Sequence, residues 1–228
     1  MMTLMKRGTI AAAIATLALT VPAKAFEAPS HETAAATQTA RIGIAVGKLS
    51  VRTEDRTGYE RTKFKHWNAG LNPSDDCNTR NEVLISEAVT TPTVSARCAL
   101  TGGSWYSYYD AKTVTSTSAL DIDHMVPLAE AWDSGASAWT AARREAYAND
   151  QGQAASLAAV TAASNRSKSD QDPAEWLPPS NGVICRYTSE WLATKLRWNL
   201  TIDTAEQTRL RQIAAGCTTT NVTWTTAP

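Results

Sequence analysis

The residues best suited to chemistry in this chain form the run Asp121-Ile-Asp-His-Met-Val-Pro127. His124 is one of three histidines, and acids stand one and three residues before it. If the run is a β-strand, Asp121 and Asp123 point to one face and His124 to the other, because side chains alternate along a strand. A carboxylate can hold a hard divalent metal while a neighbouring imidazole acts as general base, and this pairing suits phosphodiester hydrolysis.

A second polar run, Asn165-Arg-Ser-Lys-Ser-Asp170, begins 41 residues after His124. A short helix packed against a strand pair could return Asn165 to the acidic face of the first strand. Its side-chain oxygen would then be a neutral ligand for Mg²⁺, which takes few protein ligands. Arg166 and Lys168 are candidates for contacts with phosphate oxygens, and Arg144 is a further candidate on another predicted helix.

The elements that must position these residues follow from the pattern of apolar, β-branched and turn residues. A strand at 118–124, a strand at 157–161 and a short helix at about 162–169 surround the two polar runs. Further strands are expected at 93–99, 104–109 and 111–115, and further helices at 80–88, 128–132, 139–148 and 190–200. A last helix is expected from a cap at Thr204, with Gln207 completing a capping box and Gly216 ending it.

The first residues are typical of a secretory signal. Lys6 and Arg7 precede an apolar run at 10–21, and Ala23-Lys-Ala25 resembles a cleavage site. We therefore expect a signal peptide at 1–25, a flexible leader at 26–46, and one domain at 47–228. The apolar run is too short to span a bilayer comfortably, so the protein is expected to be secreted, with no membrane contact after cleavage.

Charge excludes one class of nucleic-acid binder. The chain has 22 basic and 22 acidic residues, and removing the signal takes Lys6, Arg7 and Lys24 but no acid, which leaves a net charge of −3. Such a chain does not coat nucleic acid by bulk electrostatics. An enzyme that contacts a few phosphates through a local cluster remains compatible with this charge.

Four cysteines are predicted to form structural disulfides, because an even number in an exported protein favours pairing. Three connectivities are possible. We favour Cys77–Cys98 and Cys185–Cys217, since each pair brackets a compact stretch of chain.

Both polar runs together resemble the HNH, or ββα-metal, endonuclease family. The runs Cys77-Asn-Thr-Arg-Asn-Glu-Val-Leu84, Gly103-Ser-Trp105 and Asp170-Gln-Asp-Pro-Ala-Glu-Trp-Leu-Pro178 also look like secreted HNH endonucleases of bacteria and fungi. The resemblance covers roughly residues 47–217. It implies an α+β fold with a ββα-metal core, added helices, short N-terminal strands and stapling disulfides.

The resemblance also implies roles for individual residues. His124 would be the general base, and Asp123 and Asn165 would hold one divalent metal, Mg²⁺ or alternatively Mn²⁺, with Asp121 as a further ligand. The substrate would be nucleic acid, with DNA favoured over RNA and little sequence specificity, and we expect a monomer.

One position departs from the family pattern. Many HNH domains place a second Asn before the last strand, where it braces the loop that holds the base. Here that position is Ser156, with Asn149 as the nearest alternative, and a backbone carbonyl could also orient His124.

Other functions remain open. The first alternative is a non-catalytic, extracellular nucleic-acid-binding module on a degenerate nuclease fold, which the intact Asp123, His124 and Asn165 argue against. The second is a toxin that needs an immunity partner, although such proteins usually carry delivery domains. A zinc hydrolase is disfavoured because no HExxH motif is present. His31 is expected to be a solvated side chain in the leader, and His66, next to Trp67, a packed histidine rather than a ligand.

Overall fold

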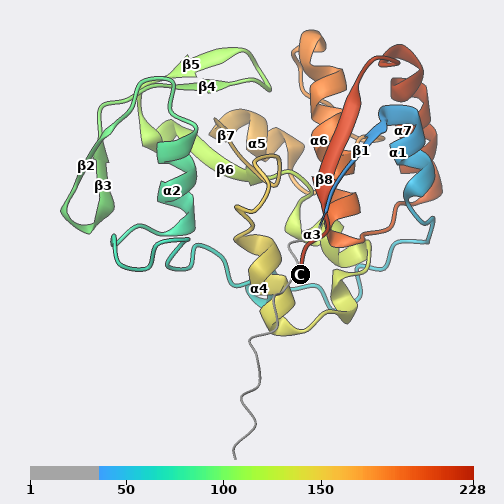
Figure 1. Cartoon of the computed structure of the whole chain (residues 1–228), viewed down its shortest axis with the longest axis horizontal. Helices are drawn as coiled ribbons and strands as arrows, with labels where there is room; N and C mark the ends of the chain where they lie inside the picture. The colour runs from blue at the N-terminus through green and yellow to red at the C-terminus, as the bar shows by residue number, and fades with distance from the viewer. Residues whose placement is uncertain (1–35) are drawn as a thin grey trace, which may run out of the picture. The chain divides into compact units, whose positions relative to one another are not determined.

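The structure is a computed structural model that describes residues 36–228, so the predicted signal at 1–25 and the first part of the predicted leader lie outside the described residues. The described chain mixes helices with short strands (Figure 1). The helices are α1 (Ile42–Lys48), α2 (Thr79–Ser86), α3 (Leu128–Asp133), α4 (Ala141–Ala148), α5 (Ala162–Lys168), α6 (Ile184–Trp198) and α7 (Thr204–Gly216). The strands are β1 (Thr37–Arg41), β2 (Thr93–Ser95), β3 (Ala99–Thr101), β4 (Trp105–Ser107), β5 (Lys112–Val114), β6 (Leu120–His124), β7 (Leu157–Thr161) and β8 (Asn221–Thr225).

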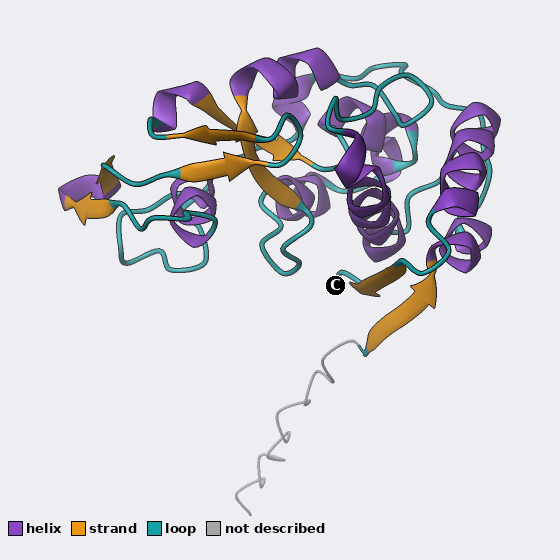
Figure 2. Ribbon diagram, turned by 90° about the horizontal axis from the view of Figure 1, so that it is seen from above, coloured by secondary structure: helices purple, strands orange, loops and turns teal. Residues whose placement is uncertain are grey.

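Within the described residues the strands form antiparallel pairs rather than one large sheet: β1 with β8, β2 with β3, β4 with β5, and β6 with β7. In Figure 1 the pair β6–β7 lies between α2 with β2–β5 on one side and α6, α7 and α1 on the other. Figure 2 shows β1 and β8 at the margin, away from the other strand pairs.

The β6–β7 pair and α5 form a continuous strand–strand–helix unit. Asp123 pairs with Ala158 and His124 with Leu157 in the ladder. The chain passes from β7 directly into α5, and the Thr161 side chain accepts a hydrogen bond from the backbone N–H of Ser164 to cap that helix. This short connection fixes α5 relative to β6.

The two faces of the β6–β7 pair pack against different cores. One face packs in a small cluster with α2 and β4, made of Val83, Leu84, Trp105, Leu120, Ile122, Leu157 and Ala159. Ala158 and Val160 on the opposite face join the larger core around Tyr109, Tyr187 and Trp191. Asp121 and Asp123 share that second face with them, because side chains alternate along a strand. The alternation therefore separates the two carboxylates from the imidazole of His124.

Both favoured disulfides are present. Cys77–Cys98 joins the residues before α2 to the turn between β2 and β3, and Cys185–Cys217 joins the start of α6 to the residue after α7. They enclose sequence separations of 21 and 32 residues. Each bridge constrains one side of the molecule rather than linking its two sides.

The prediction of a flexible leader up to residue 46 is wrong from Thr37 onward. Residues 37–41 form β1, which pairs with β8 at the far end of the chain, and α1 follows directly. Ile42, Ala45 and Val46 are buried, at the helical spacing that places them on one face. The strand partner is more than 180 residues away in the sequence, so a local pattern does not reveal it.

Three predicted boundaries also need correction. The strand expected at 93–99 is two short strands, because Arg97 and Cys98 adopt positive φ and reverse the chain between them. The last helix is capped by Asp203 rather than Thr204, since the Asp203 carboxylate accepts the Glu206 N–H at 2.7 Å. The helix expected at 190–200 begins earlier, at Ile184.

Within residues 36–228, every helix is too short or too polar to cross a lipid bilayer.

Candidate active site

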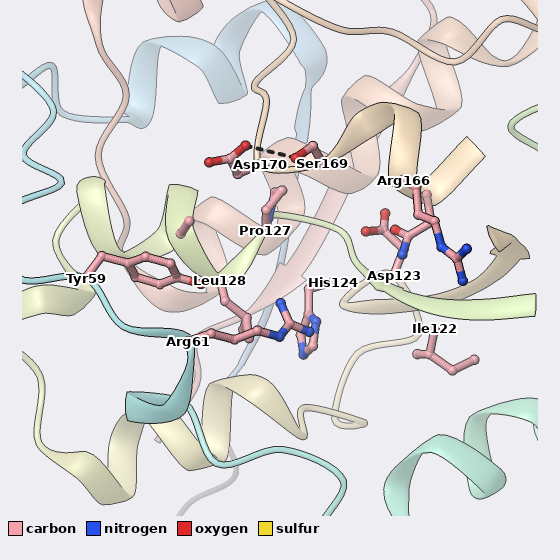
Figure 3. Close-up of a pocket in the computed structure, with 12 residues that line it drawn as sticks. Tyr59, Arg61, Ile122, Asp123, His124, Pro127, Leu128, Arg166, Ser169 and Asp170 are labelled. Carbon is pink, nitrogen blue, oxygen red and sulfur yellow. Dashed lines mark hydrogen bonds between the residues drawn. The ribbon is translucent and has the colours of Figure 1, made fainter. Parts of the chain in front are cut away.

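A pocket of about 460 Å³ opens at the end of β6, and we call it the His124 pocket (Figure 3). It is lined by Tyr59, Arg61, Ile122, Asp123, His124, Pro127, Leu128, Ala129, Asn165, Arg166, Ser169 and Asp170. The lining comes from β6, the start of α3, α5 and a segment near residue 60. The pocket therefore brings together Asp123, His124 and Asn165, the three residues around which the sequence predicts a site.

The imidazole of His124 is held by a backbone carbonyl. Nε2 of His124 lies 2.9 Å from the carbonyl oxygen of Ala148, the last residue of α4. A carbonyl oxygen only accepts hydrogen bonds, so Nε2 carries the proton and Nδ1 of the neutral ring keeps its lone pair. The ring is thus set in the tautomer in which Nδ1 can accept a proton.

Two aromatic neighbours pack on the same ring. Trp67 is stacked on His124, with ring centroids 5.4 Å apart and an interplanar angle of 20°, and His66 meets the ring edge-on at 6.1 Å. Burial is the main cause that lowers the pKa of His124 from 6.5 to about 3; the hydrogen bond to Ala148 acts in the opposite direction, and the nearby His66, Arg61 and Lys168 add to the lowering. His124 is therefore neutral at physiological pH. His66 packs as we expected, but its position beside His124 was not foreseen.

In the family pattern one asparagine holds the loop that carries the base. Here several neighbouring residues share that role. Asn149 donates to the carbonyl of Lys65 at 2.9 Å and accepts the N–H of Asn68 at 3.1 Å, which holds the segment that carries Trp67. Ser156 accepts the N–H of Met125, the residue after His124, through its carbonyl oxygen. The orientation of His124 therefore depends on the backbone of Ala148 and on the side chain of Asn149.

Asp150 anchors this loop to the core. Its carboxylate accepts hydrogen bonds from Arg197 Nε at 2.7 Å, from Arg197 Nη2 at 2.8 Å, from Trp198 Nε1 at 2.8 Å and from the Ser156 hydroxyl at 2.6 Å. A buried carboxylate with a two-pronged arginine is held firmly. The network connects α6 to the loop that positions the imidazole.

On the other face of β6, Asp123 is buried and fixed by two donors. Its Oδ2 accepts the Tyr109 hydroxyl at 2.6 Å and the Lys168 ammonium at 2.5 Å. Lys168 also donates to the carbonyls of His124 and Met125 at 2.9 and 3.0 Å. Burial raises the pKa of Asp123, while Lys168 and Tyr109 act in the opposite direction.

The prediction that Lys168 contacts phosphate is wrong. Its side chain is fully buried, and its three hydrogen bonds all go to the end of β6 and the residues that follow. A buried ammonium with a carboxylate and two carbonyls around it has no free donor to offer a substrate. Lys168 instead fixes Asp123 and the turn beyond His124.

Asp121, Asn165 and Arg166 meet where α5 faces β6. Asn165 Nδ2 donates to Asp121 Oδ2 at 3.2 Å, and Arg166 Nε lies 3.5 Å from the same oxygen. The Arg166 side chain is 75% exposed at the rim of the pocket. Such an exposed guanidinium is free to turn toward a bound phosphate.

The oxygen donors near the pocket fit a hard divalent metal. Tyr109 and Lys168 occupy only Oδ2 of Asp123, and the Asn165 amide donates through nitrogen, which leaves its oxygen as an acceptor. Two carboxylates and an amide are the ligand types that Mg²⁺ and Mn²⁺ prefer.

The prediction that Arg144 contacts the substrate is also wrong. Its guanidinium donates to the carbonyls of Lys63 at 3.2 Å and Ala136 at 3.3 Å, and to that of Trp139. It also lies over the Trp132 ring. These bonds join α4 to Lys63, before α2, and to the segment between α3 and α4, so Arg144 has a structural role.

Arg61 is a pocket residue that the sequence did not single out. It begins a short 3₁₀ turn at Arg61–Lys63, and its side chain extends toward His124 (Figure 3). No acid lies within ion-pair distance of Arg61 among residues 36–228. No sequence pattern pointed to Arg61, because it reaches the pocket from a loop that is remote in sequence from both polar runs.

Known proteins match this chain at two levels. Residues 77–213 match the family described as GmrSD restriction endonucleases, C-terminal domain. An "Uncharacterized secreted protein" of the fungus Arthroderma benhamiae is 38% identical over 214 residues, covering 93% of this chain and 100% of the relative. No solved structure matches the chain significantly.

The family match contains Asp121, Asp123, His124 and Asn165 but begins after the segment that carries Arg61 and Trp67. The fungal relative, by contrast, aligns with nearly the whole chain. The pocket is therefore completed by residues outside the matched domain.

Proposed function

Because this chain belongs to the family of GmrSD restriction endonuclease C-terminal domains, we propose that it is an endonuclease that hydrolyses phosphodiester bonds of nucleic acid, with DNA favoured. The unit β6–β7–α5 serves as an HNH-type core with one divalent metal, Mg²⁺ or Mn²⁺, held by Asp123 and Asn165 and with Asp121 beside them. The observation that carries the proposal is the His124 ring, whose Nε2 is engaged by Ala148 so that Nδ1 is available as a base.

In the proposed reaction, Nδ1 of His124 takes a proton from a water molecule. The resulting hydroxide attacks phosphorus in line, the bond from phosphorus to the 3′ oxygen breaks, and the departing oxygen takes a proton from water, so that the products end in a 5′-phosphate and a 3′-hydroxyl. The divalent ion, when bound, offsets negative charge on the phosphate and on the departing oxygen. Arg61 and Arg166, which both line the pocket, bind the non-bridging phosphate oxygens.

The role of Lys168 and Tyr109 is to keep Asp123 fixed and ionised. Both donate to Oδ2, which holds the carboxylate in place and leaves its other oxygen to serve as the metal ligand. Trp67 and Ala148 hold the neutral ring of His124 in place from the opposite face of β6. Base and ligand are thus held by different parts of the structure.

We also propose that the protein acts outside the cell, as a monomer that cleaves with little sequence preference. Support comes from the predicted signal, from the two disulfides and from the fungal relative, which is described as secreted. The net charge of −3 expected after signal removal favours contacts at the cleavage site over an extended binding face.

Plasmid nicking by wild-type protein and by His124→Ala tests the proposal. With Mg²⁺ or Mn²⁺ the wild type nicks and EDTA stops it, whereas His124→Ala is slower by about 10²- to 10⁴-fold. Asn165→Ala requires more metal for the same rate, while its matched control Asn181→Ala, at an exposed position, behaves as wild type. A DNA gel shift without cleavage by the wild type would contradict the proposal and favour a binding module. Full activity of His124→Ala would remove the assigned base.

A further inference from the structure

A cluster of acidic side chains lies outside the His124 pocket, between α3, α7 and the segment 50–68, which is part of the connection from α1 to α2. One oxygen from each of Glu54, Glu130 and Asp133 lies within 4.8 Å of the others. Glu54 also forms such a group with Asp172 and Glu206. Glu54, on the 50–68 segment, is therefore the point at which the two groups meet.

Two basic side chains of this region, Lys195 and Arg56, already form ion pairs. Lys195 is fully buried and contacts Glu130 at 2.6 Å and Glu206 at 2.7 Å. Arg56 contacts Asp133 and Asp170, each at 2.6 Å. Neither Glu54 nor Asp172 is in an ion pair within residues 36–228, so the carboxylates of this cluster outnumber the cations that pair with them.

An unpartnered buried oxygen points to a missing ligand. The Asp133 side chain is 2% exposed, and its Oδ2 is taken by Arg56. Its Oδ1 is enclosed and has no hydrogen-bond partner among residues 36–228. A buried carboxylate oxygen without a donor or a cation is costly, so its persistence calls for a partner at this place.

The hydrogen bonds decide between the two acidic groups. Both oxygens of Glu206 are occupied, one by Trp191 Nε1 at 2.5 Å and the other by Lys195. Glu130 uses only Oε1, for Lys195 and for the Ser134 hydroxyl at 2.7 Å. Within residues 36–228, each of Glu54, Glu130 and Asp133 therefore keeps at least one carboxylate oxygen without a hydrogen bond, whereas Glu206 keeps none.

The chemistry of the group suits calcium. Three carboxylates within 4.8 Å of one another offer hard, charged oxygens, and Ca²⁺ takes about six to eight oxygen ligands, whereas Mg²⁺ demands near-ideal octahedral geometry and usually keeps several waters. Ca²⁺ also tolerates irregular sets of carboxylates completed by water. Glu54 is exposed to solvent, so water can complete the coordination sphere.

We propose that Glu54, Glu130 and Asp133 bind one Ca²⁺ ion, which fixes the 50–68 segment against α3. The segment is already attached beside this site, since Arg56 contacts Asp133 and the Thr57 carbonyl accepts a hydrogen bond from Trp132 Nε1 at 3.1 Å. Five residues beyond Arg56, the same segment delivers Arg61 to the His124 pocket. Calcium bound here supports the pocket from outside and takes no part in the reaction.

The electrostatics of Glu54 agree with this assignment. Partial burial of the carboxylate, together with the nearby carboxylates of Glu130, Asp203 and Asp172, raises the pKa of Glu54 from 4.5 to about 7. A bound divalent cation reverses that effect and keeps Glu54 ionised. The alternative occupant is a proton shared between Glu54 and Glu130, and the experiment distinguishes the two.

The test is calcium binding by the full protein after EDTA treatment and dialysis, measured by calorimetric titration and by thermal unfolding. We expect one Ca²⁺ per chain and a Tm increase of about 3 to 6 °C at tenfold the Kd. Glu54→Gln loses both effects. The matched control Glu60→Gln, an exposed acid on the same segment, keeps them. Asn165→Ala also keeps them, because the proposed nuclease metal binds elsewhere.

Limited trypsin digestion adds a readout specific to the segment. Ca²⁺ slows cleavage after Arg52, Arg56 and Arg61 in the wild type and in Glu60→Gln, but not in Glu54→Gln. Absence of a calcium effect in the wild type, or its persistence in Glu54→Gln, overturns the proposal in favour of the shared proton or of another site. Loss of the effect in Asn165→Ala overturns it as well, because the ion then belongs to the His124 pocket. None of these readouts depends on nuclease activity.

Discussion

The ammonium of Lys168 lies 2.5 Å from Oδ2 of Asp123, and both groups are buried. The same ammonium donates to the carbonyls of His124 and Met125. One side chain on α5 therefore fixes the proposed metal ligand and the backbone that carries the proposed base. The functional position of β6 depends on a residue that itself has no access to substrate.

Replacing Lys168 by Met should destabilise the protein by about 3 to 5 kcal/mol, because a buried carboxylate loses its counter-ion. Urea unfolding monitored by tryptophan fluorescence measures the loss. Lys112→Met is the matched control, since Lys112 pairs with Asp110 at 3.3 Å but its side chain is 65% exposed. That change should cost less than about 1 kcal/mol. Equal losses in the two variants would contradict the buried ion pair.

The low pKa of His124 predicts how stability depends on pH. In the unfolded chain this ring binds a proton below about pH 6.5, whereas in the folded protein burial keeps the ring neutral down to about pH 3. Stability from this group is therefore complete above pH 6.5 and is lost as the pH falls toward 3, by about 1.4 kcal/mol per pH unit within that window. Urea unfolding of wild type and His124→Gln from about pH 7 to pH 5 isolates the effect, because the variant should show the shallower dependence. Parallel curves would contradict a buried neutral ring.

The sequence predicted the strand–strand–helix unit well because its determinants are local. Leu157 to Thr161 is a short apolar run with a threonine cap, and it forms β7 at the predicted bounds. The alternation in β6 likewise places Asp121 and Asp123 on one face and His124 on the other. Asn165 lies beside Asp121 because α5 follows β7 without a loop.

The residues that the sequence did not reveal act over long distances. Arg61 and Trp67 reach the pocket from the 50–68 segment, whose path is set by hydrogen bonds from Asn149 and Arg144. Lys168 and Arg166 look alike in the sequence, yet one is fully buried and the other 75% exposed, since they occupy different faces of α5. A charge pattern alone does not give the direction of a side chain.

Arg61→Ala should reduce the rate of plasmid nicking by about 10²-fold, because one charged donor to the phosphate is lost. Stability should change little, since Arg61 is exposed and in no ion pair within residues 36–228. Single-turnover cleavage gives the rate, and thermal unfolding gives the stability. Arg52→Ala, an exposed arginine on the same segment, is the control. If both variants nick at the wild-type rate, Arg61 is not a phosphate contact.

Trp67→Ala should expose the imidazole of His124 to solvent and remove the ring that packs against one of its faces. The tryptophan ring stacks on His124 at 5.4 Å, and burial is the main cause of the low pKa of that histidine. Without the stack the pKa should rise toward 6.5, so protonation should begin to inhibit nicking at a higher pH than in the wild type. At neutral pH the rate should fall by about 10-fold, because the ring is less well oriented.

Trp67→Phe separates orientation from general destabilisation, because a phenyl ring can keep the stack. We expect Trp67→Phe to retain most of the rate and the wild-type pH profile, whereas Trp67→Ala shifts the acid limb upward. NMR titration of the His124 ring in both variants reports its pKa directly and without metal. A variant that loses activity while its pH profile and ring pKa remain those of the wild type would show that Trp67 supports the fold but does not position His124.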